Sequence, residues 1–401
     1  MPRQLAVFDT MTGKKQLFRP LTPGKVSIFV CGPTVQSLIH VGHARTSVFY
    51  DVVARYLTHL GYEVNYLMNI TDIDERITQA SAESSQDPEA LARSYTNSFL
   101  EDMKSLGNTA VTRFESVSSF VQTMIQEVAT LISRRRAYVV DGFVYFDTST
   151  FPAYGRLSHQ AREDLALRPL ELSPKKRNLA DFSLWRPDVL VKGKWNSPWG
   201  LGSPGWHIQD TAVTMSILGP QYDIHGGAYE LVYPHHEAEI AQAESLTGIK
   251  PVVKYWIHTH HVNMKGRKMS KSLGNVLTVR EALRDYSAAE LRLFLLSTHY
   301  RKDMDLTDMN AAASRLRRMR RAAGEIADAV RFDAEKAGDL AALAQFETSM
   351  NDDFDTPHAI SWVERRLWEA GKEHDLGKKE ARLSAAVAAM GILGVDLLGT
   401  S

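Results

Sequence analysis

Apolar positions near the start of the chain follow two kinds of spacing. Residues 26–30 and 64–70 are apolar runs of strand length, and the stretch 46–60 between them repeats its apolar positions at helical spacing. Strand, helix and strand in this order form a βαβ unit, which implies a right-handed crossover and a parallel sheet. The pattern therefore predicts a chain of the α/β class.

The rest of the chain shows the same two spacings. Residues 74–137 have the helical spacing, and 138–147 form a predicted hairpin whose turn is Asp141-Gly142. Beyond Asn275 the apolar positions recur at helical spacing nearly to the end of the chain. The remaining predicted elements are strands at 222–225 and 258–264 and a helix at 235–246. We therefore expect an α/β part followed by a helical tail.

The composition is that of an ordinary globular protein. The 401 residues are enough for two or three domains, and the hydrophobic and charged shares are 44% and 23%. No apolar stretch has membrane-spanning length and no signal-peptide pattern follows Met1, so we expect a cytoplasmic protein without a membrane partner. The single cysteine, Cys31, excludes an intrachain disulfide.

The net charge of +0 gives no sign of a polyanionic partner. Arginines nevertheless occupy five of the seven positions from 315 to 321. This local basic segment predicts either a nucleic-acid contact or a solvated helix face that nearby acids balance.

A predicted strand end and a predicted helix start flank the first candidate site. The strand leads into Cys31, and His40 and His43 precede the helix. A helix N-terminus holds anionic phosphate because its free N–H groups and its dipole point the same way. Both imidazoles could hydrogen-bond phosphate oxygens as charge develops in a transition state, and Gly42 would let a flat ligand approach the backbone. The alternative is that the histidines only cap the helix.

A second candidate site lies far down the chain, at residues 268–275. This short polar loop carries Lys268, Ser270 and Lys271, and its two lysines could close over a triphosphate as paired positive charges. Two motifs of this chain, His40-Val41-Gly42-His43 and Lys268-Met269-Ser270-Lys271-Ser272, resemble the pair of signature motifs of class I aminoacyl-tRNA synthetases.

Further motifs narrow the resemblance to the cysteinyl-tRNA synthetases, and this resemblance extends from about residue 17 to about residue 398. These motifs are Cys31-Gly32-Pro33-Thr34, Asn69-Ile70-Thr71-Asp72, Pro204-Gly205-Trp206-His207-Ile208, Asp223-Ile224-His225-Gly226-Gly227 and Pro234-His235-His236-Glu237. The resemblance implies a Rossmann-like class I catalytic domain at 1–275, with a connective insertion at about 74–205. A stem-contact region and a helical bundle would follow at 276–401, and we expect the family's C-terminal anticodon-binding domain to be absent.

The resemblance also implies an enzyme that uses ATP and Mg²⁺ to activate an amino acid as an aminoacyl-adenylate. Its catalytic residues would be His40, His43, Lys268 and Lys271. Asp223 would accept hydrogen bonds from the ribose, and Gly226 and Gly227 would let adenine approach the backbone. The full set of expected ATP-binding residues is Thr34, Gly42, Thr46, Trp206, Asp223, Gly226, Gly227 and Ser270. The amino acid would contact Cys31, Thr71, Asp210 and His235.

A zinc site follows from the same resemblance, with one departure. In cysteinyl-tRNA synthetases the residues that match Cys31, His235 and Glu239 bind zinc together with a second cysteine, and Asp210 stands at the position of that cysteine here. A carboxylate can bind zinc, although softer thiolates suit it better. Three outcomes compete: zinc is kept, Asp210 contacts the substrate directly without zinc, or the substrate is not cysteine. A further alternative is that Asp210 only caps the next segment.

The acceptor of the activated amino acid stays open between three hypotheses. The first is a short cysteine–tRNA ligase. The second is a paralogue that passes cysteine or a close analogue to a small amine or a carrier, as mycothiol ligase does, and the missing terminal domain favours it. The third is a non-catalytic relative that binds tRNA or nucleotide, and the intact histidine and lysine motifs argue against it.

Overall fold

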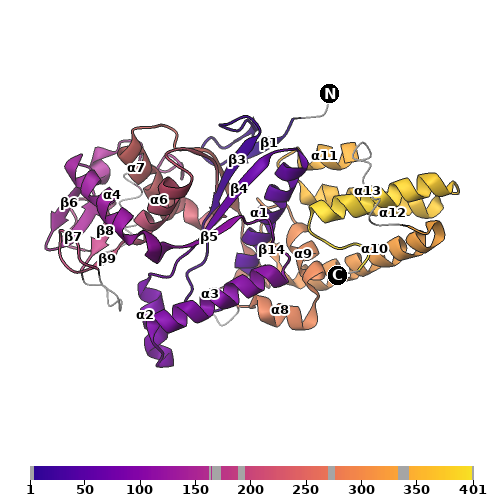
Figure 1. The fold of residues 1–401 in the computed structure, drawn as a ribbon, viewed down its shortest axis with the longest axis horizontal. Helices are drawn as coiled ribbons and strands as arrows, with labels where there is room; N and C mark the ends of the chain where they lie inside the picture. The colour runs from indigo at the N-terminus through magenta and orange to yellow at the C-terminus, as the bar shows by residue number, and fades with distance from the viewer. Residues whose placement is uncertain are drawn as a thin grey trace.

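A computed structural model describes residues 4–161, 164, 173–187, 195–269, 276–332 and 343–399 of the chain. Its centre is a parallel sheet in the strand order β11-β10-β3-β4-β5, and Figure 1 shows β3 and β4 in the middle of the molecule. The strands are β3 (Lys25–Val30), β4 (Glu63–Ile70), β5 (Arg113–Ser116), β10 (Tyr222–Ala228) and β11 (Val253–Thr259). The predicted α/β class with a parallel sheet is confirmed.

Helix α1 (Val41–His59) connects β3 to β4 and begins five residues before the predicted start at 46. The early start has a local cause, because His40 is the N-cap residue of α1 and its side chain accepts from the Gly42 N–H. The sheet is covered on both faces, since alternate side chains of a strand point to opposite sides. Ile28 and Val30 pack with α1, and Phe29 packs into a different core with α4, α6 and α7.

The segment predicted as purely helical contains a strand of the central sheet. Helices α2 (Glu75–Ser84) and α3 (Pro88–Ser105) follow the prediction, but β5 then pairs with β4. Only Phe114 of β5 is strongly apolar, so pattern alone could not mark this strand. The expected insertion at about 74–205 therefore includes a strand that belongs to the main sheet.

An antiparallel sheet of order β6-β7-β8-β9 follows β5 in the chain. Its strands are β6 (Ala137–Val140), β7 (Phe143–Phe146), β8 (Phe182–Arg186) and β9 (Ser203–Pro204), with α4 (Val121–Ser133) before them and α6 (Trp206–Ile217) after them. The predicted hairpin is confirmed as β6 and β7, and both turn residues, Asp141 and Gly142, have positive φ.

Two later predictions are corrected in detail. The helix expected at 235–246 is a short π-helical turn, Val232–His236, followed by α7 (Glu237–Thr247). The single strand expected at 258–264 is instead the end of β11 followed by β12 (Val262–Met264), which pairs with β13 (Arg267–Lys268) and β14 (Met304–Asp305). A bend between β11 and β12 thus directs the chain toward the lysine loop.

The tail is helical, as predicted, and lies on the far side of α1 from the antiparallel sheet (Figure 1). Its helices are α8 (Val279–Asp285), α9 (Ala288–Leu296), α10 (Met309–Val330), α11 (Ala344–Met350), α12 (Thr356–Lys372) and α13 (Leu376–Ile392). A buried ion pair between Arg292 and Asp51 joins α9 to α1 at 2.7 Å. Among the described residues, no helix combines the length and the hydropathy that crossing a bilayer requires.

The arginine-rich segment lies on α10 and is partly neutralised. Arg315 pairs with Glu364, Arg317 pairs with Glu290, and Arg320 donates to the backbone carbonyl of Asp396. These contacts match the interpretation of a helix face balanced by acids. Two exposed arginines of the same helix, Arg318 and Arg321, make no ion pair with any described residue.

Candidate active site

A cavity of about 350 Å³ opens where the strands of the central sheet end and α1 begins. Ligands of parallel α/β sheets bind at this edge, because loops from several strands converge there. The predicted site residues that line the cavity are Cys31, Thr34, His40, Gly42, His43, Thr46 and Trp206. The structure thus brings together residues from words that are far apart in the sequence.

The imidazoles of His40 and His43 are stacked at the start of α1, with ring centroids 3.8 Å apart and an interplanar angle of 22°. His40 Nδ1 accepts a hydrogen bond from the Gly42 N–H at 3.1 Å, and His43 Nδ1 accepts from the His40 N–H at 3.3 Å. The histidines therefore do cap the helix, as the alternative interpretation held. Capping uses only Nδ1 of each ring, and the same rings line the cavity.

Trp206 separates this cavity from a buried group of polar side chains. Its ring stacks on the ring of His235, with centroids 4.2 Å apart and an interplanar angle of 14°. The Arg76 guanidinium lies 5.6 Å from the centroid of the indole. Trp206 and Arg76 also line a second cavity of about 640 Å³, which extends toward the antiparallel sheet. The indole is therefore shared by three regions of the site.

Three predicted ATP-binding residues, Asp223, Gly226 and Gly227, do not line the cavity. Asp223 accepts hydrogen bonds from the N–H groups of Leu21 and Ser27 and from the Ser27 hydroxyl, so both of its carboxylate oxygens are engaged. It precedes Ala228, the last residue of β10 and one that lines the cavity, by five residues, which places it about 16 Å from that end of the strand.

Gly226 and Gly227 are glycines for a reason other than contact with adenine. A Cβ at Gly226 would lie 2.3 Å from the ring of Tyr50, and one at Gly227 would lie 2.9 Å from the ring of His236. Neither glycine is among the residues that line the cavity. Close packing of neighbouring rings against β10, rather than a ligand, thus explains both positions.

The predicted lysine loop is only partly described. Ser270 and Lys271 lie outside the described residues, and Lys268 is described only by the pairing of its backbone with Asn263. Met269, next in the chain, is buried and lines the cavity. The predicted roles of Lys268, Ser270 and Lys271 therefore stay predictions.

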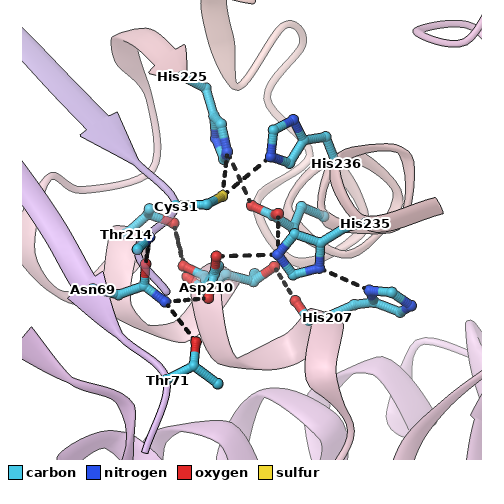
Figure 2. A network of polar contacts seen from close by, with 12 residues as sticks. Cys31, Asn69, Thr71, His207, Asp210, Thr214, His225, His235 and His236 are labelled. Carbon is cyan, nitrogen blue, oxygen red and sulfur yellow. Dashed lines mark hydrogen bonds and ion pairs between the residues drawn. The ribbon is translucent and has the colours of Figure 1, made fainter. Parts of the chain in front are cut away.

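Behind Trp206, six side chains with metal-ligating atoms form two overlapping groups of four. Both groups contain Cys31 and Glu239, and within each group the potential ligand atoms lie within 4.8 Å of one another. The first group is completed by Asp210 and His235, as predicted, and the second by His225 and His236. Figure 2 shows the Cys31 thiol between these two pairs of side chains.

Contacts in the first group centre on His235. Its Nε2 lies 3.1 Å from Asp210 Oδ2 and 3.2 Å from Glu239 Oε1. Glu239 lies four residues after His235, so the π-helical turn still presents both side chains on one face. Asp210 Oδ1 accepts a hydrogen bond from the Asn69 amide at 2.8 Å. The predicted ligand residues therefore do meet in space.

Contacts in the second group centre on the thiol. Cys31 Sγ lies 3.1 Å from His236 Nε2 and 3.5 Å from His225 Nε2. The Nε2 atom of His225 also lies 3.6 Å from Glu239 Oε2. Both histidines lie in motifs that carry the family resemblance, but neither was predicted as a ligand. Their signals were present, because His236 directly follows His235 and His225 ends a predicted strand at the sheet edge that carries Cys31.

The opposite nitrogen of each histidine ring is held by another side chain. His225 Nδ1 is 2.7 Å from the Tyr222 hydroxyl, and His236 Nδ1 is 2.8 Å from His258 Nε2. On the other side of the thiol, His235 Nδ1 is 2.9 Å from His207 Nδ1. Such outer contacts fix the orientation of a ring and the nitrogen that carries the proton, as they do around metal-binding histidines.

Asn69 and Thr71 link the cluster to the turn after β3. Asn69 Oδ1 accepts from the Gly32 N–H at 2.7 Å, while its amide donates to Asp210 and, at 3.4 Å, to the Thr71 hydroxyl. Thr71 is buried beside the cluster (Figure 2). Asp210 therefore helps to hold the turn that carries Cys31.

Burial controls the protonation of the cluster. It lowers the pKa of His225 and of His236 well below the ordinary value, and neighbouring imidazoles lower both further. Burial raises the pKa of the Cys31 thiol well above its ordinary value, and the charges of Asp210 and Glu239 raise it further. Neutral imidazoles are the form that binds metal, and a divalent cation would offset the cost of the anions.

One buried atom supports a cation at this place. Glu239 Oε1 makes no hydrogen bond with any described residue, although His235 Nε2 is 3.2 Å away. A buried carboxylate oxygen without a donor is costly unless a cation satisfies it. Thiolate, imidazole and carboxylate are all zinc ligands, so the donors present fit a zinc ion.

Known structures share the fold of this chain. The fold resembles the LeuRS-tRNA-LeuAMS ternary complex of Agrobacterium radiobacter, with a TM-score of 0.69 at 13% identity, covering 94% of this chain and 84% of that one. At this identity the likeness concerns the fold, which is that of the class I aminoacyl-tRNA synthetases.

The chain itself belongs to the family of class I (C) tRNA synthetases, whose catalytic domain matches residues 17–315. It is 41% identical over 370 residues to the "Cysteine--tRNA ligase" of Pelotomaculum thermopropionicum, covering 90% of this chain and 76% of the relative. It is 42% identical over 371 residues to the protein of the same name from Geobacter sulfurreducens, covering 90% and 77%. The chain is therefore an enzyme of the amino-acid-activating class, and these names give no support to a small amine as acceptor.

Proposed function

We propose that this protein activates cysteine with ATP and transfers it to tRNA. The observation that carries the proposal is the position of Cys31, which both lines the histidine-containing cavity and belongs to the buried donor cluster. A nucleotide in the cavity would thus lie beside a site able to select a thiol. The names of the relatives at 41% and 42% identity support the same substrate pair.

In the proposed reaction the cysteine carboxylate attacks the α-phosphorus of ATP in line, the bond to the bridging oxygen breaks, and pyrophosphate leaves. Catalysis of this kind depends on positioning and on stabilising the charge of the phosphate oxygens. His40 and His43 would contact these oxygens from the start of α1, where the helix dipole also favours an anion. We assign the opposite side to Lys268 and Lys271.

We assign the remaining contacts to ATP from the residues that line the cavity. Thr34, Thr46 and Trp206 would bind the nucleoside part, Gly42 leaves room beside the backbone, and Ser270 would act from the lysine loop. Mg²⁺ would neutralise part of the triphosphate charge. Asp223, Gly226 and Gly227 are not included, because their surroundings assign them to packing and to hydrogen bonds within the sheet.

We further propose that the donor cluster holds a zinc ion. Its ligands would come from Cys31, Asp210, His225, His235, His236 and Glu239, the members of the two overlapping groups. When bound, zinc supplies a Lewis acid that prefers the thiolate of cysteine to the hydroxyl of serine. Thr71 and Asp210 would complete the pocket for the amino acid. A cytoplasmic location belongs to the same proposal.

Exchange of radiolabelled pyrophosphate into ATP tests the activation step, because it reports adenylate formation without any acceptor. We expect exchange with cysteine that exceeds exchange with serine and alanine at least about a hundredfold. Addition of purified tRNA should then give cysteinyl-tRNA, with a yield that falls steeply as salt rises. Exchange with another amino acid, or none with cysteine, contradicts the proposal. Exchange without charging of tRNA contradicts only its second half.

A further inference from the structure

One buried carboxylate connects the helical tail to the catalytic part of the chain. Asp353 lies between α11 and α12 and is fully buried. Its Oδ1 accepts from the Phe8 N–H of β1 (Ala6–Asp9) at 2.7 Å and from the Tyr300 hydroxyl at 2.6 Å, and its Oδ2 accepts from Arg301 Nε at 2.7 Å. Asp353 therefore joins the tail to the N-terminal strand and to the segment that follows α9.

The backbone around this carboxylate is strained. Asp353 and Phe354 both have positive φ, of 65° and 53°. Aspartate tolerates this region, but two such residues in a row persist only where their surroundings hold them in place. Here the Ala6 N–H donates to the Asn351 carbonyl at 2.8 Å, and the Ala6 carbonyl accepts from the Asp353 N–H at 2.9 Å. The loop is therefore held so that the carboxylate faces its donors.

Residues 299–304, which the carboxylate holds, contact the candidate active site. The Tyr300 carbonyl accepts from the His260 N–H at 2.7 Å, and the Met304 N–H donates to the His261 carbonyl at 3.1 Å. His260 and His261 line the cavity at the start of α1 and directly precede β12. Because β12 pairs with β13, the strand before the lysine loop, this segment supports the part of the chain that leads to the lysines.

Arg45 connects the same segment to the start of α1. It lies two residues after His43 and is buried. Its guanidinium donates to three backbone carbonyls, those of His261 at 2.5 Å, of His299 at 3.2 Å and of Lys302. A planar guanidinium has several donors in fixed directions and can span such a set, whereas a lysine ammonium cannot. The helix turn with the histidines and the strand before the lysine loop are thus fixed on one segment.

We propose that Asp353 is a positioning residue for amino-acid activation, because it fixes the segment that supports both phosphate-binding parts of the site. The proposal rests on the proposed function, which assigns His43 and the lysine loop to opposite sides of the α-phosphate. Catalysis by positioning is sensitive to small displacements, since a shift of about 1 Å can lower a rate about a hundredfold. Asp353 does not line the cavity, so it acts on the reaction only through residues 299–304.

Asp353→Asn tests the proposal, because asparagine keeps the backbone conformation and one acceptor but turns a donor toward Arg301. We expect kcat for cysteine-dependent pyrophosphate exchange to fall about ten- to a hundredfold, while KM for ATP and for cysteine stays within about twofold. Rates are referred to active sites counted by the burst of adenylate, so an unfolded fraction does not lower them. An unchanged kcat per active site overturns the proposal.

The matched control is Asp51→Asn. Asp51 is also fully buried and also connects α1 to the tail, because it accepts from the Ala110 N–H at 2.9 Å and from Arg292 of α9 at 2.7 Å. Its hydrogen-bond donors lie outside residues 299–304. We expect the control to lower the free energy of unfolding but to keep kcat per active site within about twofold. An equal loss of kcat in both variants overturns the proposal, since docking of the whole tail would then explain it.

Arg45→Lys shows whether the two residues act through the same segment. It keeps the charge but loses part of the contact with three carbonyls, so kcat should fall by a similar factor. The double variant with Asp353→Asn should then lose little more than the worse single variant, whereas independent effects would multiply. A loss equal to the product of the two single losses overturns the proposal.

Hydrogen exchange followed by mass spectrometry gives a readout that needs no catalysis. Peptides that cover residues 256–264 should exchange at least about tenfold faster in Asp353→Asn, because the His260 N–H bonds to the Tyr300 carbonyl, and no faster in Asp51→Asn. Unchanged exchange overturns the proposal. Wild-type protein that activates no amino acid refutes the proposed function instead, and it does so whatever the exchange of these peptides.

Tyr300→Phe replaces Asp353→Asn in both measurements if the latter does not fold. This variant removes one donor to the carboxylate but keeps the ring, which stacks on Phe49 of α1 with centroids 4.3 Å apart. We expect a fall in kcat of about two- to tenfold, with KM unchanged. No fall in kcat and no faster exchange of residues 256–264 overturn the proposal.

Discussion

The cavity at the start of α1 and the donor cluster beside it both contain histidines, but in opposite environments. His43 is exposed and His40 is half-buried, and both rings accept hydrogen bonds from the backbone of the same helix turn. His225, His235 and His236 are no more than 1% exposed, and their rings are hydrogen-bonded to other side chains. Burial and partners, rather than residue type, therefore separate rings suited to a phosphate from rings suited to a metal.

The largest expected effect concerns the cavity alone. His43→Asn keeps an acceptor for the His40 N–H but removes the ring, so it should lower cysteine-dependent pyrophosphate exchange about 100- to 1000-fold, as loss of one transition-state partner typically does. Zinc content should stay at the wild-type level. The control is His374→Asn at an exposed position. A parallel loss of zinc would show that the two regions are not separate.

A second prediction tests burial behind the cluster, where α4 packs against α6 and α7. Burial raises the pKa of Glu127 to about 8, and its Oε2 has no partner among the described residues. The folded protein keeps this proton between about pH 4.5 and 8, where the unfolded chain loses it, so wild-type stability should fall across that range. Glu127→Gln should remove this fall in stability with pH.

We therefore expect Glu127→Gln to raise the free energy of unfolding by about 2–3 kcal/mol at pH 8.5, with little difference near pH 4.5. Urea denaturation followed by circular dichroism at both pH values measures this. Glu380→Gln at an exposed position is the control. A benefit that is the same at both pH values would contradict the assigned protonation.

A third prediction concerns a residue that the sequence assigned to the cavity and the structure places elsewhere. Asp223→Asn weakens the hydrogen bonds to Leu21 and Ser27, so it should lower the free energy of unfolding by about 1–3 kcal/mol. The KM for ATP should change less than about twofold. If instead the KM rises strongly in a protein of normal stability, Asp223 contacts the nucleotide after all.

The smallest effect is expected at Trp206, which touches both regions. Trp206→Phe keeps a ring to stack on His235 but weakens the cation–π contact with Arg76, so the KM for ATP should rise only about two- to fivefold. Zinc affinity should hardly change. A change in zinc affinity larger than the change in KM would place Trp206 with the cluster rather than with the cavity.

Much of the fold was predictable because its signals are local. The spacing at 46–60 and the apolar run at 26–30 marked α1 and β3, and Asp141-Gly142 marked the hairpin turn. Strand β5 was missed because its apolar content is low and its pairing with β4 comes from distant residues. The packing at the glycines of β10 was not predictable for a similar reason, since the ring that fills the space at Gly226 belongs to Tyr50 on another element.

The sequence alone determined which chemistry is predicted for the protein. The motifs around His40, Cys31 and Asp210 contain the candidate side chains, and a short motif can be recognised from neighbouring residues alone. Tertiary structure decided how those side chains are combined. His225 and His236 reach Cys31 only because β10 pairs in parallel with β3 and the π-helical turn after β10 folds back over the strand ends. That pairing also carries Asp223 to the far end of the sheet. Distances between side chains from separate elements follow from packing, which sequence spacing does not encode.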